Sequence, residues 1–344
     1  MPGPLQGITV VELPAIGPVP FLGMLLADLG AEVIRFQKPK SKRNFLEESF
    51  ARPPLGRGRR DIEIDLREAA AAEAVLAEVA DADALIEGFR PGVAERLGVG
   101  PEPALARNPR LVYGRMTGWG QDGPLAKTAG HDITYLAISG LLHGIGEKDR
   151  APVPPINYVA DFGGGSMFLA TGLLAAILQA RTTGAGQVVD AAMVEGAAYL
   201  GSMTAAFLGT GLWQDERGVN LLDGGMPHYR CYECSDGRYV AVGALEPQFW
   251  SALCAGLGLD EAAVGSPQDP AVRADLTALL AGRFAERTRD EWAEHFAPTD
   301  ACVAPVLSLT EAPHHPHAVA RGGYAPVAGV LMPRFAPRFS GAAD

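Results

Sequence analysis

Apolar positions near the start of the chain recur with two alternating periods. The stretch "ITVVEL" (8–13) is rich in β-branched residues and lies between a glycine and a proline. Helical spacing follows, with leucines at positions i, i+3, i+4 and i+7: Leu22, Leu25, Leu26 and Leu29. Gly30 then stands where a helix cap belongs, and "EVIRF" (32–36) is typical of a second strand. This pattern predicts a β-α-β unit.

The same alternation continues toward residue 118. "DIEIDL" (61–66) alternates apolar and polar residues, and "REAAAAEAVLAEVAD" (67–81) is rich in helix formers. "ALIEGF" (84–89) and "RLVYGRMTG" (110–118) are typical of further strands. Strands that alternate with helices predict an α/β fold with a parallel sheet. The first turn, "PAIGPVP" (14–20), lacks the G-x-G-x-x-G pattern, which disfavours a nicotinamide cofactor.

The pattern changes after about Gly186. "MVEGAAYLGSMTAAFLGTGLW" (193–213) predicts helix, and Gly and Pro interrupt the chain at "LLDGGMPHYR" (221–230). "YECSDGRYVAVGA" (232–244) contains two strand-like runs around an Asp-Gly turn, which predicts a hairpin at the start of a smaller domain. We therefore expect a large domain (1–186), a linker helix (187–225), a small domain (226–300) and a segment that returns to the large domain (301–344).

Composition and charge describe an ordinary folded protein. Of the 344 residues, 48% are hydrophobic and 20% are charged, and the net charge is -11. An acidic chain is a poor partner for nucleic acid or for an anionic membrane, so we expect neither. The apolar stretch 167–180 is shorter than a bilayer-spanning helix, and no signal-like segment opens the chain. Together these features favour a soluble cytoplasmic protein.

Two groups of residues could suggest a metal site. Cys231 and Cys234 have C-x-x-C spacing, but no second Cys or His pair follows at ligand spacing. Three histidines, at positions 314, 315 and 317, stand in a proline-containing segment without acidic or Cys companions. We expect no metal at either place.

Basic residues concentrate in one part of this acidic chain. The stretch "GRGRRDIEIDLR" (56–67) follows "QKPKSKR" (37–43), and together they hold eight basic residues: Lys38, Lys40, Lys42, Arg43, Arg57, Arg59, Arg60 and Arg67. Such a cluster suits a polyphosphate ligand, although a solvated run of charges fits the composition equally well. The local surplus of positive charge favours phosphate.

Three acidic residues and one histidine stand where site residues are often found. His131 and Asp132 precede an apolar run, and Asp132 could cap the helix predicted there. Asp161 precedes three glycines at another predicted helix start. Glycines weaken a helix start, so their presence is easier to explain if backbone amides there approach a ligand. The alternative is that Asp161 merely caps the helix and binds nothing. Glu246 directly follows a strand-like run. The combination indicates an acid/base site.

These motifs, read with their surroundings, resemble family III CoA transferases, and within that family the α-methylacyl-CoA racemases. The resemblance rests on six stretches: "GPVPFLGMLLADLGAEVIRF", "LIEGFRPGVAERLGVG", "RMTGWGQDGPLAKTAGHDITYLAISG", "VADFGGGSMFLATGLLAA", "GAGQVVDAAMVEG" and "YECSDGRYVAVGALEPQFW". Transferases of this family use the aspartate at the position of Asp161 as a nucleophile that forms an acyl anhydride. Racemases keep it and add a histidine, as at His131. The resemblance therefore implies a racemase, with CoA transfer as the alternative and a non-catalytic acyl-CoA-binding protein as a remote third.

The resemblance also implies roles for individual residues. His131 and Asp161 would exchange the parts of base and acid on the two faces of the α-carbon. Glu246 would orient the histidine, with Asp132 nearby, and Arg96 matches an active-site arginine. Six residues would contact CoA, namely Lys38, Arg57, Arg59, Arg60, Leu66 and Arg67. Amides near Asp161, including those of Gly163 and Gly164, would face the enolate oxygen. No cofactor is implied beyond the CoA of the substrate.

The resemblance implies an architecture as well. Both ends of the chain would build a large Rossmann-like parallel-sheet domain, with a small α+β domain between them. Two subunits would thread through each other into an interlocked homodimer, and each active site would lie between the large domain of one subunit and the small domain of the other.

Overall fold

The computed structural model describes residues 3–340, which divide into two compact units. The first contains the described residues of 3–141, 155–201 and 317–340, and the second contains residues 142–154 and 202–316. Both ends of the chain thus belong to the first unit. The main division falls after Gly201 rather than after residue 186, because residues 187–192 still belong to the large sheet.

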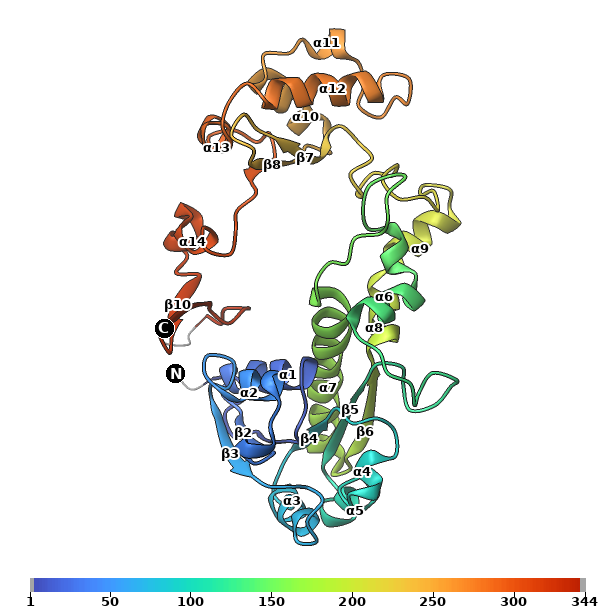
Figure 1. The fold of residues 1–344 in the computed structure, drawn as a ribbon, viewed down its shortest axis with the longest axis vertical. Coiled ribbons are helices and arrows are strands. Elements are labelled where there is room, and N and C mark those ends of the chain that lie inside the picture. The colour runs from blue at the N-terminus through green and yellow to red at the C-terminus, as the bar shows by residue number, and fades with distance from the viewer. Residues whose placement is uncertain (1–2, 341–344) are drawn as a thin grey trace. The chain divides into compact units, whose positions relative to one another are not determined.

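A six-stranded sheet organises the first unit (Figure 1), and all of its neighbouring strands run parallel. Its strands are β1 (Thr9–Glu12), β2 (Glu32–Gln37), β3 (Arg59–Glu63), β4 (Ala84–Glu87), β5 (Val112–Thr117) and β6 (Gln187–Ala192). The spatial order is β3-β2-β1-β4-β5-β6, the order of a doubly wound Rossmann-like sheet. The first five strands confirm the sequence prediction. The sixth was missed, since its residues were assigned to a linker helix.

Helices cover both faces of this sheet. On one face α1 (Pro18–Asp28) packs on β1 and β2, and α7 (Phe168–Thr183) packs on β5 and β6. On the other face α3 (Ala71–Val79) and α5 (Pro101–Arg107) pack on a core of β-branched and aromatic side chains. The central strands are therefore apolar on both sides, as in other sheets of parallel strands.

The helix that carries the glycine run begins earlier than expected. A π-helix, η3 (Tyr158–Met167), runs directly into α7, so that the continuous helix spans Tyr158–Thr183. At 26 residues it is long and apolar enough to cross a bilayer, so the expectation of a shorter segment is wrong. Length and composition alone are weak evidence for a membrane, and the contacts of this helix with β5 and β6 are those of a core helix.

The second unit contains an antiparallel sheet of three strands, β7 (Tyr229–Glu233), β8 (Tyr239–Gly243) and β9 (Val303–Pro305). The β7–β8 pair confirms the predicted hairpin around the Asp-Gly turn. Four helices accompany it: α10 (Pro247–Gly256), α11 (Glu261–Val264), α12 (Arg273–Phe284) and α13 (Arg289–Phe296). Trp250, Phe284 and Trp292 are buried between sheet and helices, so this unit has its own apolar core.

The remaining elements are short. In the first unit they include α2 (Phe45–Ala51), α4 (Val93–Arg96), α6 (Asp132–Ser139), α8 (Met193–Leu200), β10 (Tyr324–Val327) and β11 (Val330–Pro333). Two further short helices are α9 (Ser202–Gly209) and α14 (Pro316–Ala320).

Candidate active site

A cavity of about 430 Å³ opens in the first unit at the carboxyl ends of the central strands. It is lined by the turn after β1, the loop after β4 and the end of β5. The strand order reverses between β1 and β4, and ligands of doubly wound sheets bind in the crevice at such a switch point. His131 and Asp161 both line this cavity. The structure thus brings together the predicted acid/base pair across thirty positions of sequence.

His131 occupies the N-cap position of α6, with an extended backbone. Its backbone N–H donates to Thr134 Oγ1 at 2.9 Å, and the Thr134 hydroxyl donates back to the His131 carbonyl at 2.7 Å. These bonds fix the backbone while leaving the exposed imidazole available to the cavity. Because α6 starts at Asp132, the prediction that Asp132 caps this helix is wrong.

Asp132 instead caps the helix that carries Asp161. Its Oδ2 accepts hydrogen bonds from the backbone N–H groups of Ala160 and Asp161, both at 2.8 Å. The Asp132 side chain is buried, with 6% exposed. A carboxylate at the first turn of a helix satisfies amide groups that have no partner within that helix. Asp132 therefore ties the start of α6, beside His131, to the first turn of η3.

Asp161 is the fourth residue of the π-helix η3 and is only partly exposed. Burial raises its pKa above the ordinary value for an aspartate, while an amide hydrogen bond from Asn157 at 3.3 Å opposes the shift and the Asp132 charge adds to it. The buried setting of Asp161 thus favours the protonated form of its carboxyl group. Single π-helical turns within helices often occur at functional sites, and this one holds the candidate acid.

The glycines after Asp161 have a packing role. A side chain at Gly164 would place its Cβ 2.5 Å from the Ala197 backbone N, and one at Gly196 would lie 1.9 Å from the Gly164 carbonyl oxygen. Helices η3 and α8 can lie this close only without these side chains. A Cβ at Gly163 would be less crowded, at 3.3 Å from Leu200 Cδ1 of α8. The run of glycines is therefore explained by helix packing.

Among the described residues, backbone amides without a hydrogen-bond partner lie at a different helix start, that of α6. The Asp161 amide, predicted to face an enolate oxygen, is occupied by Asp132. In the described part of the chain, the N–H groups of Asp132 and Ile133 at the start of α6 donate no hydrogen bond. Such free amides, next to His131, carry the partial positive charge of a helix N-terminus.

Several lining residues were missed by the sequence analysis. Arg90 lies in the loop after β4 and lines the cavity, whereas Arg96 is exposed and donates to the Gly92 carbonyl of its own helical turn at 3.0 Å. Trp119 and Tyr135 also line the cavity, with ring centroids 4.8 Å apart in an edge contact. The position of Arg90 just after a predicted strand was the signal that could have identified it.

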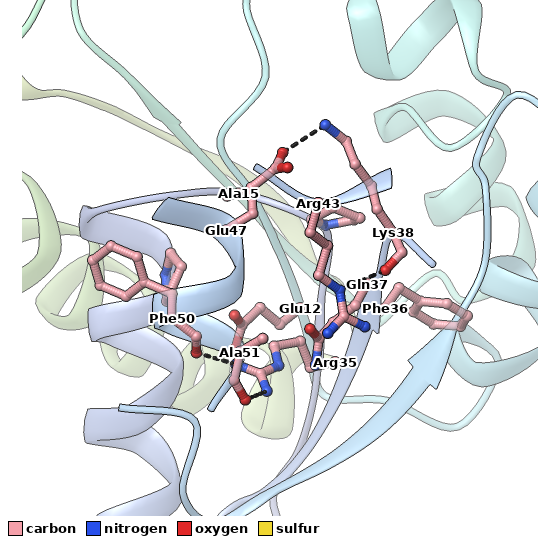
Figure 2. A pocket seen from close by; sticks show the side chains of 12 residues that line it. Glu12, Ala15, Arg35, Phe36, Gln37, Lys38, Arg43, Glu47, Phe50 and Ala51 are labelled. Carbon is pink, nitrogen blue, oxygen red and sulfur yellow. Dashed lines mark hydrogen bonds and ion pairs between the residues drawn. The ribbon is translucent and has the colours of Figure 1, made fainter. Parts of the chain in front are cut away.

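The predicted phosphate-binding cations all have acidic partners. The pairs are Lys38–Glu47, Arg57–Asp28, Arg59–Glu12, Arg60–Glu78 and Arg67–Asp65. Figure 2 shows Lys38 directed at Glu47 and, nearby, Arg35 bonded to the carbonyls of Phe50 and Ala51. Arg57 and Arg59 thus form largely buried ion pairs, whereas the side chains of the other three cations are paired but half or more exposed.

Arg59 is the clearest departure from the phosphate prediction. Its side chain is 0% exposed and its Glu12 partner is 1% exposed, with Nη1 and Oε2 3.1 Å apart. Burial raises the pKa of Glu12, and the positive charge of Arg59 opposes this rise. Such a pair is inaccessible to a ligand, and removing either partner would leave a buried charge.

A second hollow retains part of the predicted CoA region. Lys38, Lys42 and Arg67 surround it together with Asp65, and its volume is about 390 Å³. Three cations and one carboxylate leave a net positive surface suited to phosphate. Leu66 packs against the core of the first unit beside this hollow.

Helix α2 presents apolar side chains to the main cavity. Leu46 and Phe50 line it, while Glu47 faces the protein and is held by Lys38. Asn44 caps this helix by accepting the Glu47 N–H at 3.0 Å. The usual amphipathic arrangement is thus inverted, with ion pairs toward the protein and apolar groups toward the cavity.

Glu246 lies in the second unit, at the N-cap position of α10 directly after β8. It is exposed, and its charge adds to the effect of burial, which raises the pKa of the Cys302 thiol. The role of Glu246 toward His131 remains a prediction.

Comparison with known proteins decides the family. The model of CoA-transferase family III matches residues 5–343. This chain belongs to CoA-transferase family III. Among family relatives, it is 45% identical to the alpha-methylacyl-CoA racemase of Mus musculus, over 91% of this chain and 80% of that protein. It is 43% identical to the alpha-methylacyl-CoA racemase of Homo sapiens, over 93% of this chain and 82% of that protein.

The fold is that of solved family III structures. A CAIB/BAIF family protein from Brucella suis superposes with a TM-score of 0.84 at 29% identity, covering 99% of this chain and 94% of the other. The predicted α/β class and the resemblance to the family are thus confirmed.

Proposed function

We propose that this family III protein is an α-methylacyl-CoA racemase, which epimerises 2-methylacyl-CoA thioesters by 1,1-proton transfer. The observation that carries the proposal is that His131 and Asp161, from two different helices, line one cavity at the switch point of the sheet. The names and identities of the mouse and human relatives support it.

The proposed reaction moves one proton off the α-carbon and returns another to its opposite face. In one direction the His131 imidazole accepts the α-proton while the Asp161 carboxyl group donates one, and in the other direction the two exchange roles. The intermediate is an enolate whose oxygen needs hydrogen-bond donors. The amides of Asp132 and Ile133, which adjoin His131 and have no partner within the described residues, would supply such donors. A thioester already acidifies its α-proton, so the proposed reaction needs no metal and no cofactor beyond the CoA of the substrate.

The raised pKa of Asp161 suits the direction in which this residue donates a proton, and the histidine at position 131 is the feature that favours racemisation over CoA transfer. An acid that must donate a proton near neutral pH works better when its pKa is raised. CoA transfer is the second candidate because the family takes its name from that reaction.

Two measurements separate these candidates. A single enantiomer of a 2-methylacyl-CoA should become a mixture of both, as followed by chiral chromatography, and a His131→Ala variant should lose this activity. Treatment with hydroxylamine or borohydride in the presence of acyl-CoA should leave Asp161 unmodified. A covalent acyl adduct at Asp161 would favour the transferase, and tight binding with neither reaction would favour a non-catalytic acyl-CoA-binding protein.

The substrate and the assembly follow from the same proposal. CoA phosphates would lie at Lys38 and Arg67, the two predicted cations that share a positive hollow. An interlocked homodimer would cover apolar side chains exposed in the first unit, such as Ile138 (63% exposed), Tyr158 (54%) and Leu178 (69%). Light scattering coupled to gel filtration should then give the mass of two chains, and a monomer would contradict the dimer.

A further inference from the structure

A ladder of charged side chains crosses the sheet next to the cavity. Glu87 is the last residue of β4, and its register partner on β5 is Arg115, whose own partner on β6 is Asp190. Register partners on neighbouring strands project to the same face of a sheet. Glu95 of α4 covers that face and contacts Arg115 Nη1 at 2.9 Å. The ladder thus lies beneath the loops that leave the carboxyl ends of these strands.

Glu87 joins this ladder to the cavity wall. Its Oε1 accepts a hydrogen bond from Arg115 Nε at 3.1 Å, and its Oε2 accepts one from the backbone N–H of Phe89 at 2.6 Å. The loop so held, residues 88–91, lines the cavity that His131 and Asp161 also line. One carboxylate therefore connects the sheet to the loop that carries Arg90.

Stability alone does not explain a carboxylate at this position. The Glu87 side chain is 0% exposed, and ion pairs buried this deeply contribute little net stability compared with apolar residues of similar size. What such a group supplies is a fixed geometry, because both of its oxygens have one defined donor each. The geometry that it fixes here is that of the loop.

We propose that Glu87 is a positioning residue for the proton transfer, which holds loop 88–91 so that Phe89 and Arg90 shape the cavity around the thioester. The inference rests on the proposed function, since it assigns Glu87 a role in that same reaction. Loss of the carboxylate should misplace the cavity wall relative to His131 and Asp161. A displacement of about 1 Å can cost on the order of 100-fold in rate, and the loss should fall on kcat more than on KM.

The charge state of Glu87 gives the proposal a distinct signature. Burial raises its pKa to about 7, against the opposing effects of the Phe89 amide and Arg115. The charged or titratable groups that influence it are Arg115 and Tyr113 of β5 and Glu95 of α4, with Asp190 beyond Arg115. As the pH falls through about 7, Glu87 takes up a proton and holds the loop less firmly, so kcat should decrease.

The experiment compares Glu87→Gln with a matched control, Glu95→Gln, which removes the other carboxylate of Arg115 without touching the loop. Racemisation of a 2-methylacyl-CoA is measured from acidic to alkaline pH for both variants and the wild type. We expect Glu87→Gln to lower kcat roughly 10-fold to 100-fold at alkaline pH and to lose the Glu87-dependent decrease near pH 7. Glu95→Gln should keep the wild-type kcat at alkaline pH and should keep the decrease, moved to lower pH because the Glu95 charge helps to raise the pKa of Glu87. A Glu87→Asp variant retains the charge, so it should keep the decrease near pH 7 at a lower kcat.

The outcomes separate this inference from the proposed function. If the wild type does not racemise the substrate at all, the proposed function fails. If the wild type is active and Glu87→Gln has the same kcat and the same pH profile, Glu87 has no positioning role. If Glu87→Gln does not fold, as judged by circular dichroism, the Glu87→Asp variant decides: wild-type kcat and pH profile in that variant would overturn the inference.

Discussion

Replacing Asp132 with alanine tests the link between the two catalytic helices. The carboxylate accepts two backbone hydrogen bonds of 2.8 Å, from Ala160 and Asp161. Alanine offers no acceptor, so two amide groups in a largely buried region lose their partner. Each buried donor left without a partner costs about 1–3 kcal/mol, which gives roughly 2–6 kcal/mol for the pair. Entry of water into the space would bring the cost toward the lower value.

The same substitution also changes Asp161 electrostatically. The Asp132 charge is one cause of the raised pKa of Asp161, so its removal should lower that pKa. A smaller fraction of Asp161 would then carry the proton near neutral pH, and racemisation should slow even in the folded protein. An Asp132→Asn variant keeps an acceptor oxygen and loses the charge, so it should lower the pKa of Asp161 with a smaller loss of stability, about 1 kcal/mol.

The assay is unfolding in urea followed by circular dichroism, together with the pH dependence of racemisation. The exposed Asp81 provides a control, because Asp81→Ala removes a carboxylate of the same kind that is not buried. The reasoning is refuted if Asp132→Ala unfolds at the same urea concentration as Asp81→Ala and keeps the wild-type pH profile.

Three further substitutions probe separate parts of the site. Asn157→Ala removes an amide that lowers the pKa of Asp161, so the pH profile of racemisation should shift to higher pH; an unchanged profile would contradict this. Asn44→Ala removes the N-cap of α2 at a cost of about 1 kcal/mol, and KM should rise with kcat retained, as steady-state kinetics would show. Arg59→Leu leaves Glu12 buried without its partner, which should destabilise the protein by roughly 3–5 kcal/mol in thermal or urea unfolding. A stable Arg59→Leu protein with only a raised KM would instead mean that Arg59 binds CoA.

Local patterns in the sequence predicted much of the fold. The β-branched stretch 8–13 predicted a strand, and the structure has β1 there. The leucines at helical spacing along residues 22–29 predicted a helix, and the structure has α1 there. Strand β6 was missed because its neighbours in sequence are helical and its partner, β5, lies far away in the chain. The π-helical turn was missed because the glycines indicated only the start of a helix, and the close fit against α8 that they allow exists only in the folded chain.

Within the site, the sequence identified residue types more reliably than their contacts. His131 and Asp161 could be selected because each adjoins a recognisable helix start and motif. The cap by Asp132 spans 28 positions, and the Arg59–Glu12 pair spans 47, so no local pattern indicates either contact. Arg96 was chosen over Arg90 by resemblance, and the loop geometry that favours Arg90 exists only in the folded chain.

Exchange of the α-proton with solvent tests the central claim most directly. A single enantiomer of a 2-methylacyl-CoA is incubated with the protein in deuterated water, and the α-proton signal is followed by NMR with chiral analysis of the product. Our account predicts that deuterium enters the α-position as both enantiomers appear, and that His131→Ala and Asp161→Asn each abolish racemisation. Retention of the α-proton with wild-type protein, or full exchange with racemisation in the His131→Ala variant, would contradict it.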